Sequence, residues 1–130
     1  MTHFFIDSPD GVHTVQFTML GEVPHGETWH AIVINGRDLP KRFFGTLAQW
    51  SHDSRYLALQ ENHYDASTGS PSRVALIDIE KACVAYFPST HPYGRVTDFH
   101  FGEGTFSFRE HSTMPRATVK LTTIADWQPL

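Results

Sequence analysis

Nine histidines and fourteen acidic residues are the side chains of this 130-residue sequence that most readily take part in chemistry. Metal sites in short motifs show close spacings such as H-x-x-x-H or C-x-x-C, and the sequence has neither. Strand pairing can still assemble one set, because Asp98 and His100 share a strand face and His111 follows the next strand. Two histidines and one carboxylate suit a transition metal. We favour surface and loop histidines over that cluster, so we predict no metal and no cofactor.

Asp98, His100 and Glu103 stand near one predicted turn, where an acid and a base could act together. The sequence has no nucleophile phrase of the G-x-S-x-G type and no phosphate-binding P-loop. Gly102 and Gly104 lack the third glycine and the following helix of a phosphate loop, so they predict a hairpin turn. An enzyme is therefore the second choice. It would be a small β-barrel enzyme or ligand carrier that uses Asp98, His100 and His111.

Two polar segments, 62–72 and 89–95, follow strands of the central pattern. Each combines an aromatic ring with polar neighbours, which is typical of the anchors of protein interfaces. In an antiparallel meander both segments leave the same end of the sheet, because two strand reversals separate them. Solvent-exposed linkers are the alternative interpretation of both segments. Together with two acidic residues nearby, the predicted partner-binding residues are His63, Tyr64, Asp65, His91, Tyr93, Glu103 and Glu110.

Alternating apolar and polar residues, joined by short turns, recur along the whole chain. Residues 12–20 show the alternation of a half-buried strand, whereas residues 73–79 are apolar on both faces and should form a central strand with Ile77 fully buried. No segment of ten residues has a convincing helical pattern. We predict one all-β domain, residues 1–130, with an antiparallel meander that forms a two-layer sandwich or partly open barrel of about nine strands.

Several finer expectations follow from local signals. Residues 3–7 should form an edge strand, and residues 117–124 the last strand. Residues 37–44 look irregular, with Asp38 able to cap a short turn of helix. Asn35-Gly36 is the strongest hairpin signal of the sequence. The single cysteine, which excludes an intrachain disulfide, is expected to be a small buried apolar residue. Trp127 is expected to plug an open end of the core.

Composition limits the possible compartments and partners. Hydrophobic residues make up 40% of the chain and charged residues 18%, as in ordinary globular proteins. The net charge of −4 argues against nucleic acid, because such binding needs a basic surface. The first residues lack a basic start, and no apolar run approaches the roughly 18 residues of a membrane span. We therefore expect a cytoplasmic protein without membrane contact, as a monomer or small homo-oligomer.

The phrases W-S-H-D-S-R-Y-L-A-L and V-A-L-I-D-I-E-K fall within residues 46–87. This stretch resembles one blade of a β-propeller of the WD type, in which a polar turn with aspartate separates apolar strands. The resemblance implies a four-stranded meander here. A closed propeller needs at least about four blades of roughly 40 residues each, so 130 residues cannot close the ring.

The overall profile is small, acidic and free of catalytic motifs, and in this it is similar to bacterial toxin-immunity proteins. That resemblance implies a toxin domain as partner, blocked by tight docking. Asp65, Glu103 and Glu110 would complement a basic toxin surface and speed the encounter. We therefore predict a non-enzymatic protein-binding module. The alternatives are the enzyme or ligand carrier above, and an assembly module whose blade-like sheet completes a propeller through oligomerisation.

Overall fold

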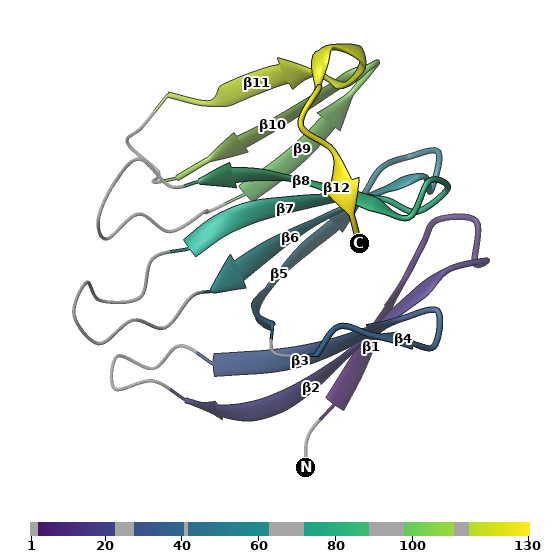
Figure 1. Ribbon diagram of the computed structural model, residues 1–130, viewed down its shortest axis with the longest axis vertical. Coiled ribbons are helices and arrows are strands. Elements are labelled where there is room, and N and C mark those ends of the chain that lie inside the picture. Colours follow the sequence, from purple (N-terminus) through teal and green to yellow (C-terminus); the bar gives the residue numbers. More distant parts are fainter. Residues whose placement is uncertain (1–2, 23–27, 41, 63–71, 89–97, 111–114) are drawn as a thin grey trace.

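The computed structural model describes residues 3–22, 28–40, 42–62, 72–88, 98–110 and 115–130 (Figure 1). This part of the chain contains strands and one 3-10 turn, η1, but no α-helix. The elements in chain order are β1 (His3–Asp7), β2 (Thr14–Glu22), β3 (Thr28–Ile34), β4 (Arg37–Asp38), β5 (Phe43–Trp50), β6 (Tyr56–Asn62), β7 (Ser72–Asp78), β8 (Cys83–Pro88), β9 (Asp98–Gly102), β10 (Thr105–Arg109), β11 (Ala117–Lys120), η1 (Leu121–Thr123) and β12 (Gln128–Pro129).

The strands form two antiparallel sheets. The larger has nine strands in the order β1-β2-β3-β5-β6-β7-β8-β12, with β4 added to β3, and the smaller has the order β11-β10-β9. The predicted all-β antiparallel class is confirmed, as is the edge position of β1. The large sheet is open and does not close into a barrel.

A bend at the junction of β3 and β5 gives the molecule its layers. One residue pair, His30 with Phe44, joins these two strands, and the register of β5 on β6 shifts between Phe44 and Ala48. The layer β1–β3 therefore lies against one face of β5–β8, and the small sheet lies against the other face (Figure 1).

Two hydrophobic cores fill the spaces between the three layers. The first contains Val15, Phe17, Ile32, Ile34, Leu39, Phe44, Trp50, Leu57, Leu59, Ala75, Ile77 and Val84. The second contains Ala58, Val74, Leu76, Phe99, Phe101, Phe106 and Phe108. Alternate residues of β6 and β7 enter opposite cores, so both faces of these strands are covered. This confirms the prediction for residues 73–79, and Ile77 is fully buried.

Residues 37–44 differ from the expectation of an irregular segment with a short turn of helix. Arg37 and Asp38 form β4, which pairs with the end of β3 across the Asn35-Gly36 turn. Both turn residues have positive φ, 49° and 80°, as the hairpin signal predicts. Leu39 then enters the first core, because its N–H donates to the carbonyl of Ile32 at 3.3 Å.

Two finer expectations, on the last long strand and on Cys83, are wrong. The last long strand, β11, ends at Lys120 rather than at residue 124, because the 3-10 turn follows and Thr123 Oγ1 donates to the Lys120 carbonyl at 2.8 Å. Cys83 is half-buried rather than buried, since it begins β8 at a sheet edge where, among the described residues, only the two residues of β12 pair with it. Trp127 packs against the second core.

None of the helical turns in the described ranges has the length and apolar character needed to cross a lipid bilayer.

Candidate functional site

An open recess of about 500 Å³ lies where the turn between β5 and β6 meets the hairpin between β9 and β10. Its volume falls in the range of small-molecule pockets, roughly 300–1,000 Å³. Both turns lie at the right-hand end of the molecule in Figure 1. The recess has a polar rim and an apolar wall, formed by His52, Asp53 and Glu103 and by Tyr56, Phe101 and Leu121 respectively.

The β5–β6 turn is held by its own polar side chains. Ser51 Oγ donates to Asp53 Oδ1 at 2.6 Å and accepts the N–H of Tyr56 at 2.9 Å. The N–H of Arg55 adds a third bond, to Asp53 Oδ1 at 3.2 Å. The bond from Ser51 is the main reason that the pKa of Asp53 lies below its usual value. Asp53 is therefore a fixed negative charge at neutral pH.

Two glycines shape the hairpin that presents Glu103. A Cβ at Gly102 would lie 2.6 Å from Thr105 Oγ1, which is closer than real Cβ contacts allow. Gly104 has φ of +67°, in the left-handed region that side chains rarely adopt. The predicted hairpin is thus confirmed, and Glu103 stands exposed at its tip.

The apolar wall belongs to the second core. Phe101 is buried there, and the ring of Tyr56 stacks on Trp127 with centroids 6.3 Å apart. Burial raises the pKa of Tyr56, so its hydroxyl stays protonated. The guanidinium of Arg55 lies 5.1 Å from the Tyr56 ring centroid. These contacts give the recess a rigid aromatic side.

The nearby cation is already neutralised. Arg55 Nη2 lies 3.0 Å from Asp78 Oδ2, and its Nε lies 3.5 Å from Glu80. These interactions raise the pKa of Arg55 further, so the charge is permanent and paired. The rim carboxylates of Asp53 and Glu103 therefore give this corner an excess of negative charge.

Of the seven predicted partner-binding residues, the structure describes two, Glu103 and Glu110. His63, Tyr64, Asp65, His91 and Tyr93 lie outside the described residues, as does His111 of the alternative site. Arg73 of β7 pairs with Glu61 of β6 on one side and with Pro88 of β8 on the other. The strand ends that flank both polar segments therefore share one end of the sheet. In the small sheet Glu103 lies at one end and Glu110 at the other, next to the Arg109–Asp98 pair.

Asp98, His100 and Glu103 do not meet at one turn as the sequence suggested. Asp98 begins β9 and Glu103 follows its end, so at about 3.3 Å per residue they are roughly 16 Å apart. Asp98 Oδ2 accepts a hydrogen bond from Arg116 Nη2 at 2.7 Å, and His100 is exposed on the same strand. In the described part of the chain, no three His, Cys, Asp or Glu side chains form a group able to hold a metal ion.

Sequence reasoning identified Glu103 but missed the rest of the recess. Its walls come from three separated segments. Leu121 reaches the β9–β10 hairpin through the pairing of β10 with β11, and residues 51–56 join them when the small sheet packs on β5–β8. The sequence predicts a turn at residues 51–54, but it has no signal that this turn faces the hairpin between β9 and β10. Comparison of the chain with protein-family models, with curated proteins and with solved structures finds no match.

Proposed function

We propose that this chain is a non-enzymatic protein-binding module whose acidic recess receives a lysine or arginine side chain of a basic partner. The observation that carries the proposal is the pairing of two rim carboxylates, Asp53 and Glu103, with an aromatic and aliphatic wall. Lysine and arginine bury an apolar stem and keep a cationic head in a polar setting. The stem would lie along Tyr56 and Phe101, and the head between the carboxylates.

The chemistry of the rim favours binding over catalysis. Ser51 donates its hydroxyl hydrogen to Asp53, and its oxygen accepts the Tyr56 N–H, so both roles hold the turn. Its side chain is buried, with 5% of the residue exposed. A serine nucleophile instead needs a base that takes its hydrogen and an exposed oxygen. The enzyme or ligand-carrier alternative rests on Asp98, His100 and His111. Asp98 pairs with Arg116, His100 is exposed, and His111 lies outside the described residues.

The class that fits best is an immunity protein that acts in the cytoplasm of a bacterium and neutralises a cognate toxin by direct binding. The net charge of −4 supports this, because complementary charge speeds association with a basic domain. We further propose that the chain acts as a monomer or small homo-oligomer. Completion of a propeller by several copies, which the blade-like stretch 46–87 suggests, stays a prediction.

A test of the immunity proposal starts from the gene next to the one for this chain. If that neighbour encodes a growth-inhibiting basic domain, co-expression with this chain should restore growth, and calorimetry should show a tight complex. Glu103→Lys should weaken the complex at least tenfold, because it places a cation against a cation. Asp38→Lys, in the exposed strand β4, is the matched control and should bind as the wild type does. A neighbour that binds both variants equally well would contradict the proposed docking site.

A further inference from the structure

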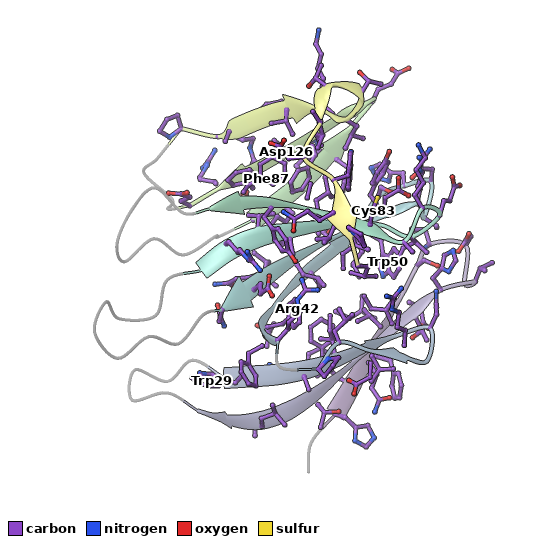
Figure 2. The ribbon with its side chains drawn as sticks, viewed as in Figure 1. Trp29, Arg42, Trp50, Cys83, Phe87 and Asp126 are labelled. Carbon is purple, nitrogen blue, oxygen red and sulfur yellow. The ribbon has the colours of Figure 1, made fainter. Side chains whose placement is uncertain are left out.

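A second charged group lies at the opposite end of the large sheet, around a buried carboxylate. Glu61 is in β6 and only 1% of it is exposed. Arg42, just before β5, donates Nε to Glu61 Oε1 at 2.7 Å and Nη2 to Oε2 at 3.4 Å. Arg73, directly across on β7, donates Nε to Glu61 Oε2 at 2.8 Å. Figure 2 shows Arg42 between the layer β1–β3 and the layer β5–β8.

The charges of this group do not balance. Burial alone would raise the pKa of Glu61, but the hydrogen bonds from Arg42 and Arg73 reverse the effect, and its pKa lies below the usual value. Glu61 is therefore ionised at neutral pH. Two guanidinium cations face it, and among the described residues no other carboxylate forms an ion pair with either. Counted over the described residues, one positive charge of the group has no paired carboxylate.

Aromatic rings hold the two guanidinium groups in place. The Arg73 guanidinium carbon lies 3.5 Å from the ring centroid of Tyr86. The Arg42 guanidinium carbon lies 5.6 Å from the rings of Tyr86 and Phe44. Stacking of this kind engages the flat faces of the cation and leaves its N–H edges for hydrogen bonds. The arginines are thus positioned before any ligand arrives.

Hydrogen-bond donors remain at the edge of the group. Arginine has five N–H donors, and Glu61 engages Nε of Arg73 together with Nε and Nη2 of Arg42. Within the described ranges, Nη1 and Nη2 of Arg73 and Nη1 of Arg42 make no hydrogen bond. The side chains of Arg42 and Arg73 are 19% and 27% exposed, so solutes can reach them.

We propose that Arg42 and Arg73 form a binding site for an oxyanion, and that a carboxylate is its favoured ligand. The surplus positive charge supplies the attraction, and the Nη1–Nη2 edge of Arg73 matches the two oxygens of a carboxylate. Glu61 orients the arginines and reduces their net charge from two to one. This inference does not depend on the proposed function, because it concerns a different end of the molecule and a ligand of opposite charge.

The test titrates the full chain with succinate and, in a second arm, with inorganic phosphate, at constant ionic strength, and follows ¹H–¹⁵N chemical shifts. Saturable shifts at the Nε–H signals of Arg42 and Arg73 are expected, with tighter binding of succinate. Phosphate binding tighter than succinate would overturn the carboxylate preference. Shifts that follow ionic strength alone, without saturation, would overturn the site.

Two variants separate a binding site from a purely structural ion-pair network. Glu61→Gln keeps the side-chain volume and removes the negative charge, so succinate should bind about five- to tenfold tighter. Arg73→Gln should lose succinate binding. If that variant fails to fold, the double variant Glu61→Gln/Arg73→Gln takes its place, because it leaves no buried carboxylate without a partner. Lys120→Gln, in β11, is the control and should bind as the wild type does. A structural network alone predicts no gain in affinity for Glu61→Gln, and that result would contradict the proposal.

Discussion

The indole of Trp50 donates its Nε1 hydrogen to the carbonyl of Ile6 at 3.3 Å, across 44 positions of the sequence. Trp50 ends β5 and Ile6 lies in the edge strand β1. The imidazole of His13 stacks on the same indole, with centroids 6.0 Å apart. One side chain thus ties the free edge of the first layer to the end of the second layer, next to the turn that forms the recess.

Trp50→Phe keeps an aromatic ring in the first core and removes the N–H donor. We expect a loss of about 1–3 kcal/mol in the free energy of unfolding, from the lost hydrogen bond and the smaller ring. Urea denaturation followed by circular dichroism measures it. Trp127→Phe, at a half-buried position, is the comparison and should cost less. Equal losses in the two variants would show that the bond to Ile6 contributes nothing.

Ile77→Ala should cost about 2–5 kcal/mol, because the side chain is fully buried in the first core and its removal leaves a cavity. Ile79→Ala, two residues further on at a partly buried position, should cost clearly less. The two denaturation midpoints give the comparison. A loss below about 1 kcal/mol for Ile77→Ala would mean that the core on this face can collapse around the gap.

His30 should make the fold sensitive to mild acid. It is 3% exposed, lies against the rings of Phe4 and Phe17, and its Nδ1 is 3.3 Å from the carbonyl oxygen of Phe44. Burial is the main cause that lowers its pKa below 6.5. The unfolded chain then binds a proton that the folded chain does not, so stability is complete above pH 6.5 and falls as the pH drops towards the folded pKa.

Denaturation at pH 8 and pH 5.5 measures this dependence. His30→Gln should lose less stability between the two pH values than the wild type does, since glutamine does not titrate. His52→Gln, at an exposed position of the β5–β6 turn, should keep the full wild-type dependence. If His30→Gln and the wild type showed the same change with pH, the buried imidazole would not be the titrating group.

The strands that could be predicted from the sequence are those with a regular pattern of apolar residues. The segment 73–79 is apolar on both faces, and β7 indeed lies between two cores. The two-residue strands β4 and β12 were missed because two residues carry no periodicity. The bend between β3 and β5 was missed as well, since it arises where one residue pair replaces a continuous ladder. Such a change in pairing depends on tertiary packing rather than on local residue preference.

The candidate site was harder to predict than the fold. Glu103 was identified because it follows a strand and sits between two glycines. Tyr56 and Leu121 were not identified, because Tyr56 comes near Glu103 through packing between the sheets and Leu121 through the pairing of β11 with β10. Arg42 lies in the segment that looked irregular, so its bonds to Glu61 had no sequence signal. Local patterns therefore located turns, whereas the neighbours of each turn depended on how the layers pack.

Titration with a short blocked peptide containing one arginine tests most directly whether the recess receives a basic side chain. ¹H–¹⁵N spectra of the full chain should show saturable shifts at Asp53, Tyr56 and Glu103. Glu103→Gln should weaken binding about five- to tenfold, since one of two rim charges is lost, and Asp38→Asn should leave it unchanged. The same peptide with citrulline in place of arginine, which keeps the shape but not the charge, should bind poorly. Equal affinity for both peptides, or no shift at the recess, would show that the recess does not bind a basic side chain through its charge.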